Sequence, residues 1–188
     1  MKLKFLFLTV AALLFLFNGC NKDTFFEEES NIELKKANVP IPFKGEVCME
    51  YNYDVPLMHV DGTPYGPIPD LYLSGEAWLS GNVTHMGKLT DESWMKGINA
   101  SLDMEALSKG RVIIVAVYDA IMYAAKGDYI ELLSNIRIDA TDPENRTITG
   151  EYNVIGGTGR FENAVGSGIF SGDLPCWSSE GTIEYPRE

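Results

Sequence analysis

Hydrophobic and polar residues alternate along most of the chain beyond residue 45. Around residue 50, for example, Val47, Met49 and Tyr51 alternate with Cys48 and Glu50. Successive side chains of a β-strand point to opposite faces of the sheet, so this alternation predicts half-buried antiparallel strands. The pattern is found in residues 46–53, 71–80, 98–105, 130–139 and 147–154.

Residues 112–117 differ from these segments, because they are apolar at every position. A strand that is apolar on both sides is expected to be covered on both faces. The interior of the protein would cover one face. The sequence leaves open whether a loop or a second subunit covers the other.

Turn signals separate the predicted strands, and helical periodicity is almost absent. Only residues 103–108, just before Gly110, are compatible with one helical turn. About eight or nine short strands with one apolar face suggest a closed barrel or a sandwich, and we predict a small closed antiparallel β-barrel of about eight strands. Closure would bring the first strand beside the last, residues 181–185. The turn signals are Asp61-Gly62, Lys109-Gly110, Lys126-Gly127, Asp142-Pro143 and residues 156–159.

The first 19 residues have the layout of a bacterial lipoprotein signal peptide. Lys2 and Lys4 precede an apolar run at residues 5–17, which is shorter than the roughly 20 residues that a membrane-spanning helix needs. Residues 16–20 resemble a lipobox, which implies cleavage before Cys20 and acylation of this cysteine. An ordinary signal peptide followed by a coincidental cysteine is the alternative.

This reading divides the chain into a signal peptide at residues 1–19, a flexible tether at 20–42 and a barrel domain at 43–188. The tether is polar and rich in Asn, Lys and Glu, so it cannot bury enough apolar surface to offset its ordering entropy. Its acidic cluster at residues 27–29 resembles the patches that send some lipoproteins to the outer face of the outer membrane, although a solvated linker explains it equally well. We therefore expect a cell-envelope protein, lipid-anchored to the outer membrane.

The net charge of the chain argues against two classes of partner. The chain of 188 residues has 15 basic and 27 acidic residues, a formal net charge of −12, and this balance opposes binding to nucleic acid. It also opposes electrostatic adhesion to anionic lipid, which leaves membrane attachment to the lipid anchor.

Once Cys20 is acylated, Cys48 and Cys176 form an even pair in an oxidising compartment. We expect a disulfide there between the two ends of the barrel; two separate thiols are the alternative.

Two glycine-containing segments carry a resemblance to a known family. They are residues 81–90, Gly-Asn-Val-Thr-His-Met-Gly-Lys-Leu-Thr, and residues 156–168, Gly-Gly-Thr-Gly-Arg-Phe-Glu-Asn-Ala-Val-Gly-Ser-Gly. Together with the link at 124–128, they resemble secreted bacterial barrels related to allene oxide cyclase and the plant dirigent proteins. This resemblance implies an eight-stranded antiparallel barrel, often oligomeric, with an apolar cavity for a small lipophilic molecule. No catalytic residue of the plant enzymes can be matched to a position here.

The second glycine segment also has an interpretation of its own. It predicts a strand, a turn in which Gly156, Gly157 and Gly159 supply positive φ, and a second strand, with Phe161 packing after the turn. A phosphate-binding loop is excluded, because no helix and no Gly-Lys-Ser/Thr sequence follows.

A candidate ligand pocket combines one histidine with three aromatic residues. If Val83 and Leu89 face inward, the alternation places His85 on their side, where an imidazole can orient a ligand or act as a base. A hydrogen-bonded structural histidine near a turn is the simpler interpretation. The aromatic candidates are Tyr51, Trp94 and Tyr152, for which a place in the core is the default.

Metal and cofactor sites find little support in the sequence. The two histidines, His59 and His85, have no partner at a metal-ligand spacing. The acidic residues around the turn at residues 139–145 lack the spacing of a calcium loop, so a solvated turn is expected there. We predict no metal, no cofactor and no assembled catalytic group.

Three functions remain open from the sequence. The first is a cell-envelope binding module whose barrel holds a small lipophilic ligand. The second is an isomerase or cyclase that acts on a lipophilic substrate, supported by fold analogy alone. The third is a structural or interaction protein that forms a homo-oligomer through the two-sided apolar strand.

Overall fold

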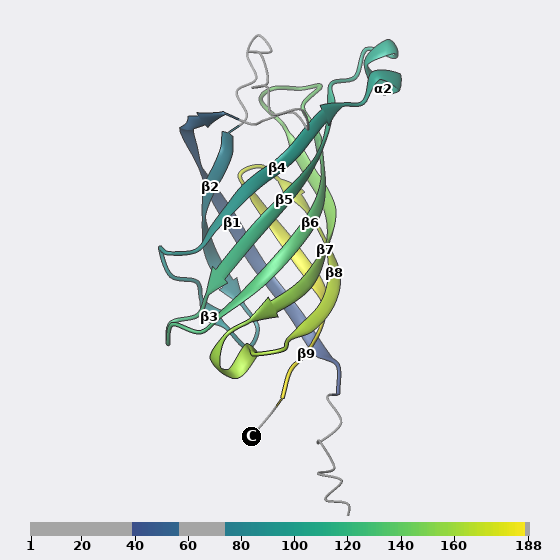
Figure 1. The fold of residues 1–188 in the computed structure, drawn as a ribbon. Helices are drawn as coiled ribbons and strands as arrows, with labels where there is room; N and C mark the ends of the chain where they lie inside the picture. Colours follow the sequence, from purple (N-terminus) through teal and green to yellow (C-terminus); the bar gives the residue numbers. More distant parts are fainter. Residues whose placement is uncertain (1–38, 57–73, 187–188) are drawn as a thin grey trace, which may run out of the picture. The chain divides into compact units, whose positions relative to one another are not determined.

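The structure is a computed structural model and describes residues 39–56 and 74–186. The predicted signal peptide, Cys20, most of the tether and His59 lie outside these ranges. The described chain consists almost entirely of β-strands, with one short α-helix and one turn of 3-10 helix (Figure 1). The elements are β1 (Ile41–Pro56), β2 (Ser74–Val83), β3 (Gly87–Lys88), β4 (Trp94–Leu102), α2 (Met104–Ser108), β5 (Ile113–Tyr123), β6 (Tyr129–Asp139), β7 (Thr147–Gly157), η1 (Gly159–Phe161), β8 (Val165–Asp173) and β9 (Cys176–Glu184).

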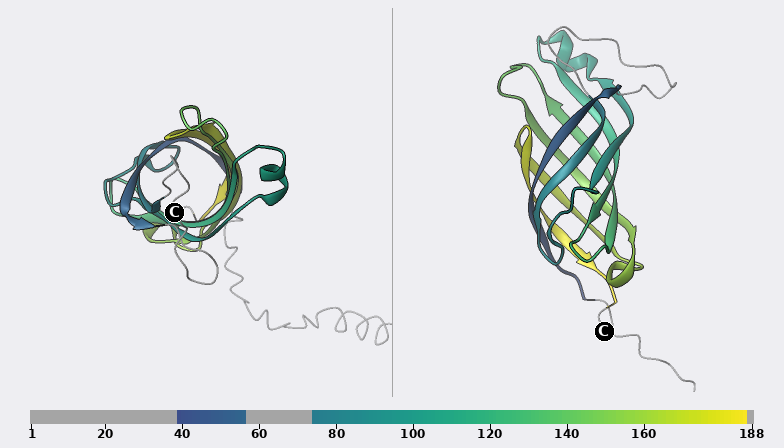
Figure 2. Two further views of the ribbon diagram at one scale, coloured as in Figure 1. Left: turned by 90° about the horizontal axis from the view of Figure 1, so that it is seen from above. Right: turned by 90° about the vertical axis from the view of Figure 1, so that its left-hand side faces the viewer.

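These strands form one antiparallel sheet that closes on itself. From β4 to β9 each strand pairs with the next one along the chain, and β2 pairs with β4. The first strand, β1, pairs with β2 on one side and with β9 on the other. Hydrogen bonds therefore ring through eight strands, and the short β3 is added beside β2. Seen from above, the strands form a closed ring (Figure 2). The predicted all-β barrel of about eight strands is confirmed.

The ends of the predicted strands shift in two places. β1 begins at Ile41, so the barrel takes in the last two residues of the predicted tether. The alternation at residues 98–105 was expected to form one strand, but β4 ends at Leu102. Asp103 instead caps α2, because its carboxylate accepts a hydrogen bond from the backbone N–H of Ala106 at 2.9 Å. The single helical turn expected at 103–108 is confirmed.

A bulge in β4 changes which side chains face the solvent. The pairing of β4 with β5 shifts between Gly97 and Asn99, which inserts one extra residue and breaks the alternation. The alternation at residues 98–105 predicts that Ile98 and Ala100, two residues apart, lie on the same face. In the structure Ala100 is buried and Ile98 is 50% exposed, so that expectation is wrong.

Aromatic side chains fill the inside of the barrel and lie against glycines of neighbouring strands. A Cβ atom at Gly168 would overlap the hydroxyl of Tyr152, and one at Gly150 would overlap the ring of Phe170. The glycines leave room on one strand for a large ring from the next. The interior core therefore combines large rings with small residues, as the taper of a small barrel requires.

The glycine turn at residues 156–159 differs from its prediction. Only Gly159 has a positive φ, 57°. At Gly157 a Cβ atom would lie 2.5 Å from the carbonyl oxygen of Tyr129, so close approach of the backbone is what requires glycine there. Phe161 follows the turn and is completely buried, as predicted.

The outer face of β5 is covered at one end only. Ile113 is 1% exposed and Ala106 of α2 is also buried, although neither belongs to the interior cluster. We infer that the loop carrying α2 covers the outside of Ile113. Two residues further along the same face, Val115 is 39% exposed. The prediction that the strand is covered on both sides therefore holds for one end of β5 and not for the other.

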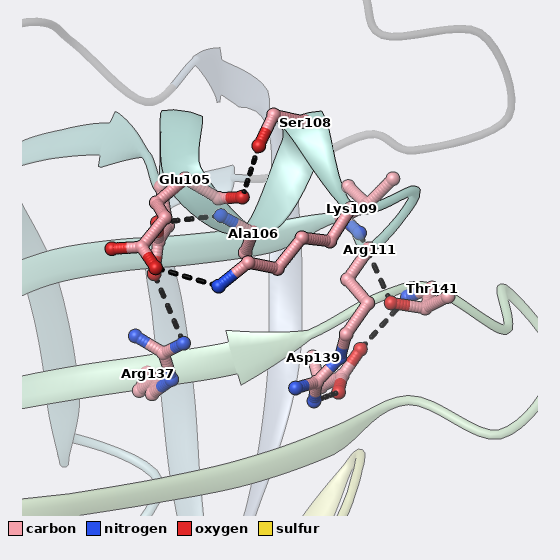
Figure 3. Close-up of polar contacts among 10 residues, drawn as sticks. Glu105, Ala106, Ser108, Lys109, Arg111, Arg137, Asp139 and Thr141 are labelled. Atoms are coloured by element: carbon pink, nitrogen blue, oxygen red, sulfur yellow. Dashed lines mark hydrogen bonds and ion pairs between the residues drawn. The ribbon is translucent and has the colours of Figure 1, made fainter.

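Polar contacts hold α2 against the barrel (Figure 3). Arg137 of β6 donates to the carboxylate of Asp103 at 3.0 Å, and Arg111 pairs with Asp139. Hydrogen bonds from Thr141, together with that guanidinium, lower the pKa of Asp139 to about 2. The loop that covers Ile113 is thus tied to β6 at both of its ends.

Candidate functional site

A disulfide joins the first and last strands of the barrel. Cys48 of β1 and Cys176 of β9 are paired residues on neighbouring strands and are bonded to each other, which confirms the predicted bridge. They are separated by 128 residues along the chain. In the chain-entropy model, a cross-link over so long a loop stabilises the folded state by about 5 kcal/mol.

The cavity inside the barrel is small. Its volume is about 30 Å³, whereas pockets for small organic ligands measure roughly 300–1,000 Å³. Its wall is mostly apolar, and its hydroxyl groups come from two serines and one tyrosine. The residues that line it include Phe43, Met95, Met122, Ser134, Tyr152 and Ser179. The interior of the barrel is therefore filled largely by its own side chains.

Tyr152 brings the one unpartnered hydroxyl to this cavity wall. The residue is 4% exposed, and its hydroxyl has no hydrogen-bond partner among the described residues. Burial raises the pKa of Tyr152 to about 12. On the neighbouring strand β6, the buried Ser134 is its direct partner in the pairing with β7. A hydroxyl in such surroundings stays neutral and is available to donate a hydrogen bond.

Tyr51, the second predicted pocket residue, packs against the core but does not line the cavity. Its hydroxyl is buried and lacks a partner among the described residues. Burial raises the pKa of Tyr51 to about 12, an effect that Arg146 opposes and Tyr53 reinforces. Burial also raises the pKa of Tyr118, and Tyr51 adds to that shift. These tyrosines are neutral at physiological pH.

His85 lies in the turn between β2 and β3, and its side chain is exposed. Val83 and Leu89 are both buried, but the backbone of His85 has a φ of 67° and the turn interrupts the alternation between them. The inward position predicted for His85 is therefore wrong. Its Nε2 lies 3.1 Å from the carbonyl oxygen of Pro42, which agrees with a hydrogen-bonded histidine near a turn.

Trp94, the last predicted pocket residue, lines a groove on the outside of the barrel. It is half-buried and is the direct partner of Trp78, which is 48% exposed. The volume of this groove is about 360 Å³. Its other lining residues are Glu76, Ala77, Asp91, Glu92 and Lys96. The four predicted pocket residues are thus not brought together, and only Tyr152 lines the interior cavity.

The sequence carries a signal for one residue of this groove. Trp78 stands between Ala77 and Leu79, which are both buried, so the alternation already assigns the tryptophan to the outer face. A large aromatic residue at a position where a polar one is expected is the signal by which the sequence points to this outer surface.

Apolar side chains also lie on the outer wall around β5. Ile98 of β4, Val115 of β5 and Leu133 of β6 are exposed on three neighbouring strands, and we call these three residues the apolar wall. Arg137 and Asn135 lie beside them on β6. On β8, Ile169 lines a further shallow groove together with Val115.

Within the described residues, no group of three or more His, Cys, Asp or Glu side chains is arranged to hold a metal ion. In the acidic turn considered for calcium, the carboxylate of Asp142 accepts hydrogen bonds from the amide of Asn145 and from the backbone N–H of Glu144. These bonds lower the pKa of Asp142. None of the helices in the described ranges has the length and apolar character needed to cross a membrane.

No family model, no curated protein and no solved structure matches this chain.

Proposed function

We propose that this protein is a lipid-anchored interaction module of the cell envelope, which contacts its partner with the outer wall of the barrel. The volume of the interior carries this proposal. A cavity of about 30 Å³ has room for water but not for a lipophilic molecule. The outer surface, in contrast, exposes large apolar side chains on several strands.

Two features support the proposed location. The N-terminal 20 residues resemble a lipoprotein signal with Cys20 as the acylated residue. The disulfide between Cys48 and Cys176 suits an oxidising compartment outside the cytoplasm. Mass spectrometry of the protein from the membrane fraction tests the anchor. Two acyl chains or more on Cys20 are expected, and an unmodified Cys20 would contradict it.

A second copy of this chain is the partner that we propose for the apolar wall. The three residues of the wall lie on neighbouring strands with polar residues between them, because Val115 pairs with Arg137 and Leu133 pairs with Asp119. Burial of the exposed apolar side chains would favour association of two such surfaces. In a symmetric dimer the same patch of both subunits would be buried. The partner would then cover the exposed part of the outer face of β5.

A second candidate function is binding or cyclising a small lipophilic molecule inside the barrel. The proposed kinship with allene oxide cyclase and dirigent proteins supports it, since a ring of eight antiparallel strands is the fold that this kinship implies. The unpartnered hydroxyl of Tyr152 would supply a polar contact. This function requires the interior to open well beyond its present volume.

Native mass spectrometry of protein purified from its own host separates the two candidates. A dimer mass without a bound small molecule is expected. Val115→Lys and Leu133→Lys, which place a charge in the apolar wall, should each shift the protein to monomer. Ser171→Lys adds the same charge at an exposed position on β8 and should leave the dimer intact. A monomer with a stoichiometric apolar ligand would contradict the proposal and support the second candidate.

A further inference from the structure

The groove beside Trp78 and Trp94 combines aromatic and acidic side chains on the outer wall. The two tryptophans lie side by side on β2 and β4. Paired residues on neighbouring strands have their Cβ atoms roughly 5 Å apart, which is within reach for two indoles to act on one ligand. Asp91 and Glu92, from the turn before β4, line the same groove. Two ring surfaces and two carboxylates therefore meet in one place.

A buried serine holds the acidic turn in position. Ser93 is completely buried. Its carbonyl oxygen accepts a hydrogen bond from the backbone N–H of Leu79 at 2.8 Å, and its hydroxyl accepts one from that of Tyr123 at 2.9 Å. The turn is thus attached to β2 and to β5, on the two sides of Trp94. The backbone of this turn therefore needs little ordering when a ligand binds.

The charge of the groove is negative. Three carboxylates and one ammonium group line it, which leaves two negative charges in excess. Lys96 forms an ion pair with Glu76 at 3.6 Å. Asp91 and Glu92 have no side-chain partner in the part of the chain that the structure describes. A cation in the groove would therefore meet carboxylates that are not already neutralised.

We propose that this groove binds a small organic cation of the quaternary ammonium type. A cation over an indole is attracted by the negative face of the ring, and aromatic sites that hold methylated ammonium groups use this attraction. The methyl groups of such a cation lie against Trp78 and Trp94, and its charge faces Asp91 and Glu92. A small metal cation gains little from the indoles, because it is strongly hydrated.

The size of the groove and its charge favour this ligand over a neutral one. Its volume of about 360 Å³ lies in the range of small-molecule sites. A neutral sugar would stack on the tryptophans, but it would gain no Coulomb attraction from the excess negative charge. The groove is separate from the apolar wall, so this inference does not depend on the proposed interaction function.

NMR of the three tryptophan indoles tests the proposal. The complete chain is ¹⁵N-labelled, purified in a non-ionic detergent and titrated with tetramethylammonium chloride, with sodium chloride at equal ionic strength as the control. The indole N–H signals of Trp78 and Trp94 should shift and saturate. Trp177, which is buried inside the barrel, should stay in place. Equal shifts with sodium, or a Trp177 shift of the same size, would overturn the proposal.

Matched variants distinguish the effect of the carboxylates in the acidic turn from the effect of net charge. Asp91→Asn combined with Glu92→Gln should weaken binding by about tenfold, as expected for the loss of two nearby charges. Glu162→Gln combined with Asp173→Asn removes the same charge at exposed positions elsewhere and should leave the affinity unchanged. Equal effects of the two pairs would overturn the site. So would methyl glucoside binding at least as tightly as tetramethylammonium, because the groove would then be a site for neutral sugars.

Discussion

The inside and the outside of this barrel use aromatic residues in opposite ways. Inside, Tyr152 and Phe170 lie over glycines of neighbouring strands and take up the space that a ligand would need. Outside, Trp78 and Trp94 line an open groove with carboxylates beside them. The comparison shows that the number of aromatic residues does not indicate a pocket in such a fold. What decides is the face of the strand on which each residue lies.

The contrast depends on closure of the barrel, and the largest predicted effect concerns the bond that joins its ends. Replacing Cys48 and Cys176 together with serine should lower the free energy of unfolding by about 5 kcal/mol, because a loop of 128 residues loses its cross-link. Chemical denaturation of the oxidised protein and the double variant measures this. The reduced wild type serves as control and should match the variant. A loss below about 1 kcal/mol would show that the sheet closes without help from the bridge.

Truncation of one interior and one outer residue on the same strand tests the contrast directly. Phe170→Ala should cost about 4 kcal/mol, since it leaves a cavity beside Gly150. Its neighbour Ile169 is 58% exposed, and Ile169→Ala should cost less than about 0.5 kcal/mol. Thermal unfolding followed by circular dichroism compares the two variants. Similar losses for both would mean that the outer face is buried in an assembly. The enlarged cavity of Phe170→Ala should also bind a small apolar probe, which the wild type should not.

The smallest predicted effect concerns the hydroxyl of Tyr152. Tyr152→Phe should raise the free energy of unfolding by about 1 kcal/mol, because the variant no longer buries a hydroxyl without a partner. The pKa of Tyr152 is raised to about 12, so the unfolded chain loses this proton at lower pH than the folded one. The stability of the wild type should therefore fall between about pH 10 and pH 12, and the advantage of Tyr152→Phe should grow over that window. A destabilised variant would show that the hydroxyl has a partner, such as a bound water.

Part of the candidate site followed from the sequence and part did not. Tyr152 alternates regularly with polar neighbours along β7, and the structure places it inside as that pattern predicts. In the sequence His85 follows the same alternation. A turn lies between Val83 and Leu89, however, and the positive φ of His85 in this turn directs its side chain outward. Ile98 is displaced by a bulge in the same way. Alternation fails wherever one residue is added or the backbone changes direction, and a single sequence does not mark these places.

The sequence by itself determined the alternating strands, because these follow from a local period of two. It favoured a closed barrel over a sandwich and a Cys48–Cys176 bridge over two separate thiols, and the pairing of β1 with β9 decided both. The tertiary structure alone decided that the barrel is filled, since the free volume depends on how Tyr152 and Phe170 meet the glycines opposite them. It also decided that Trp78, Trp94, Asp91 and Glu92 share one groove. Residues from two strands and a turn come together only through the register between strands, and no local pattern encodes that register.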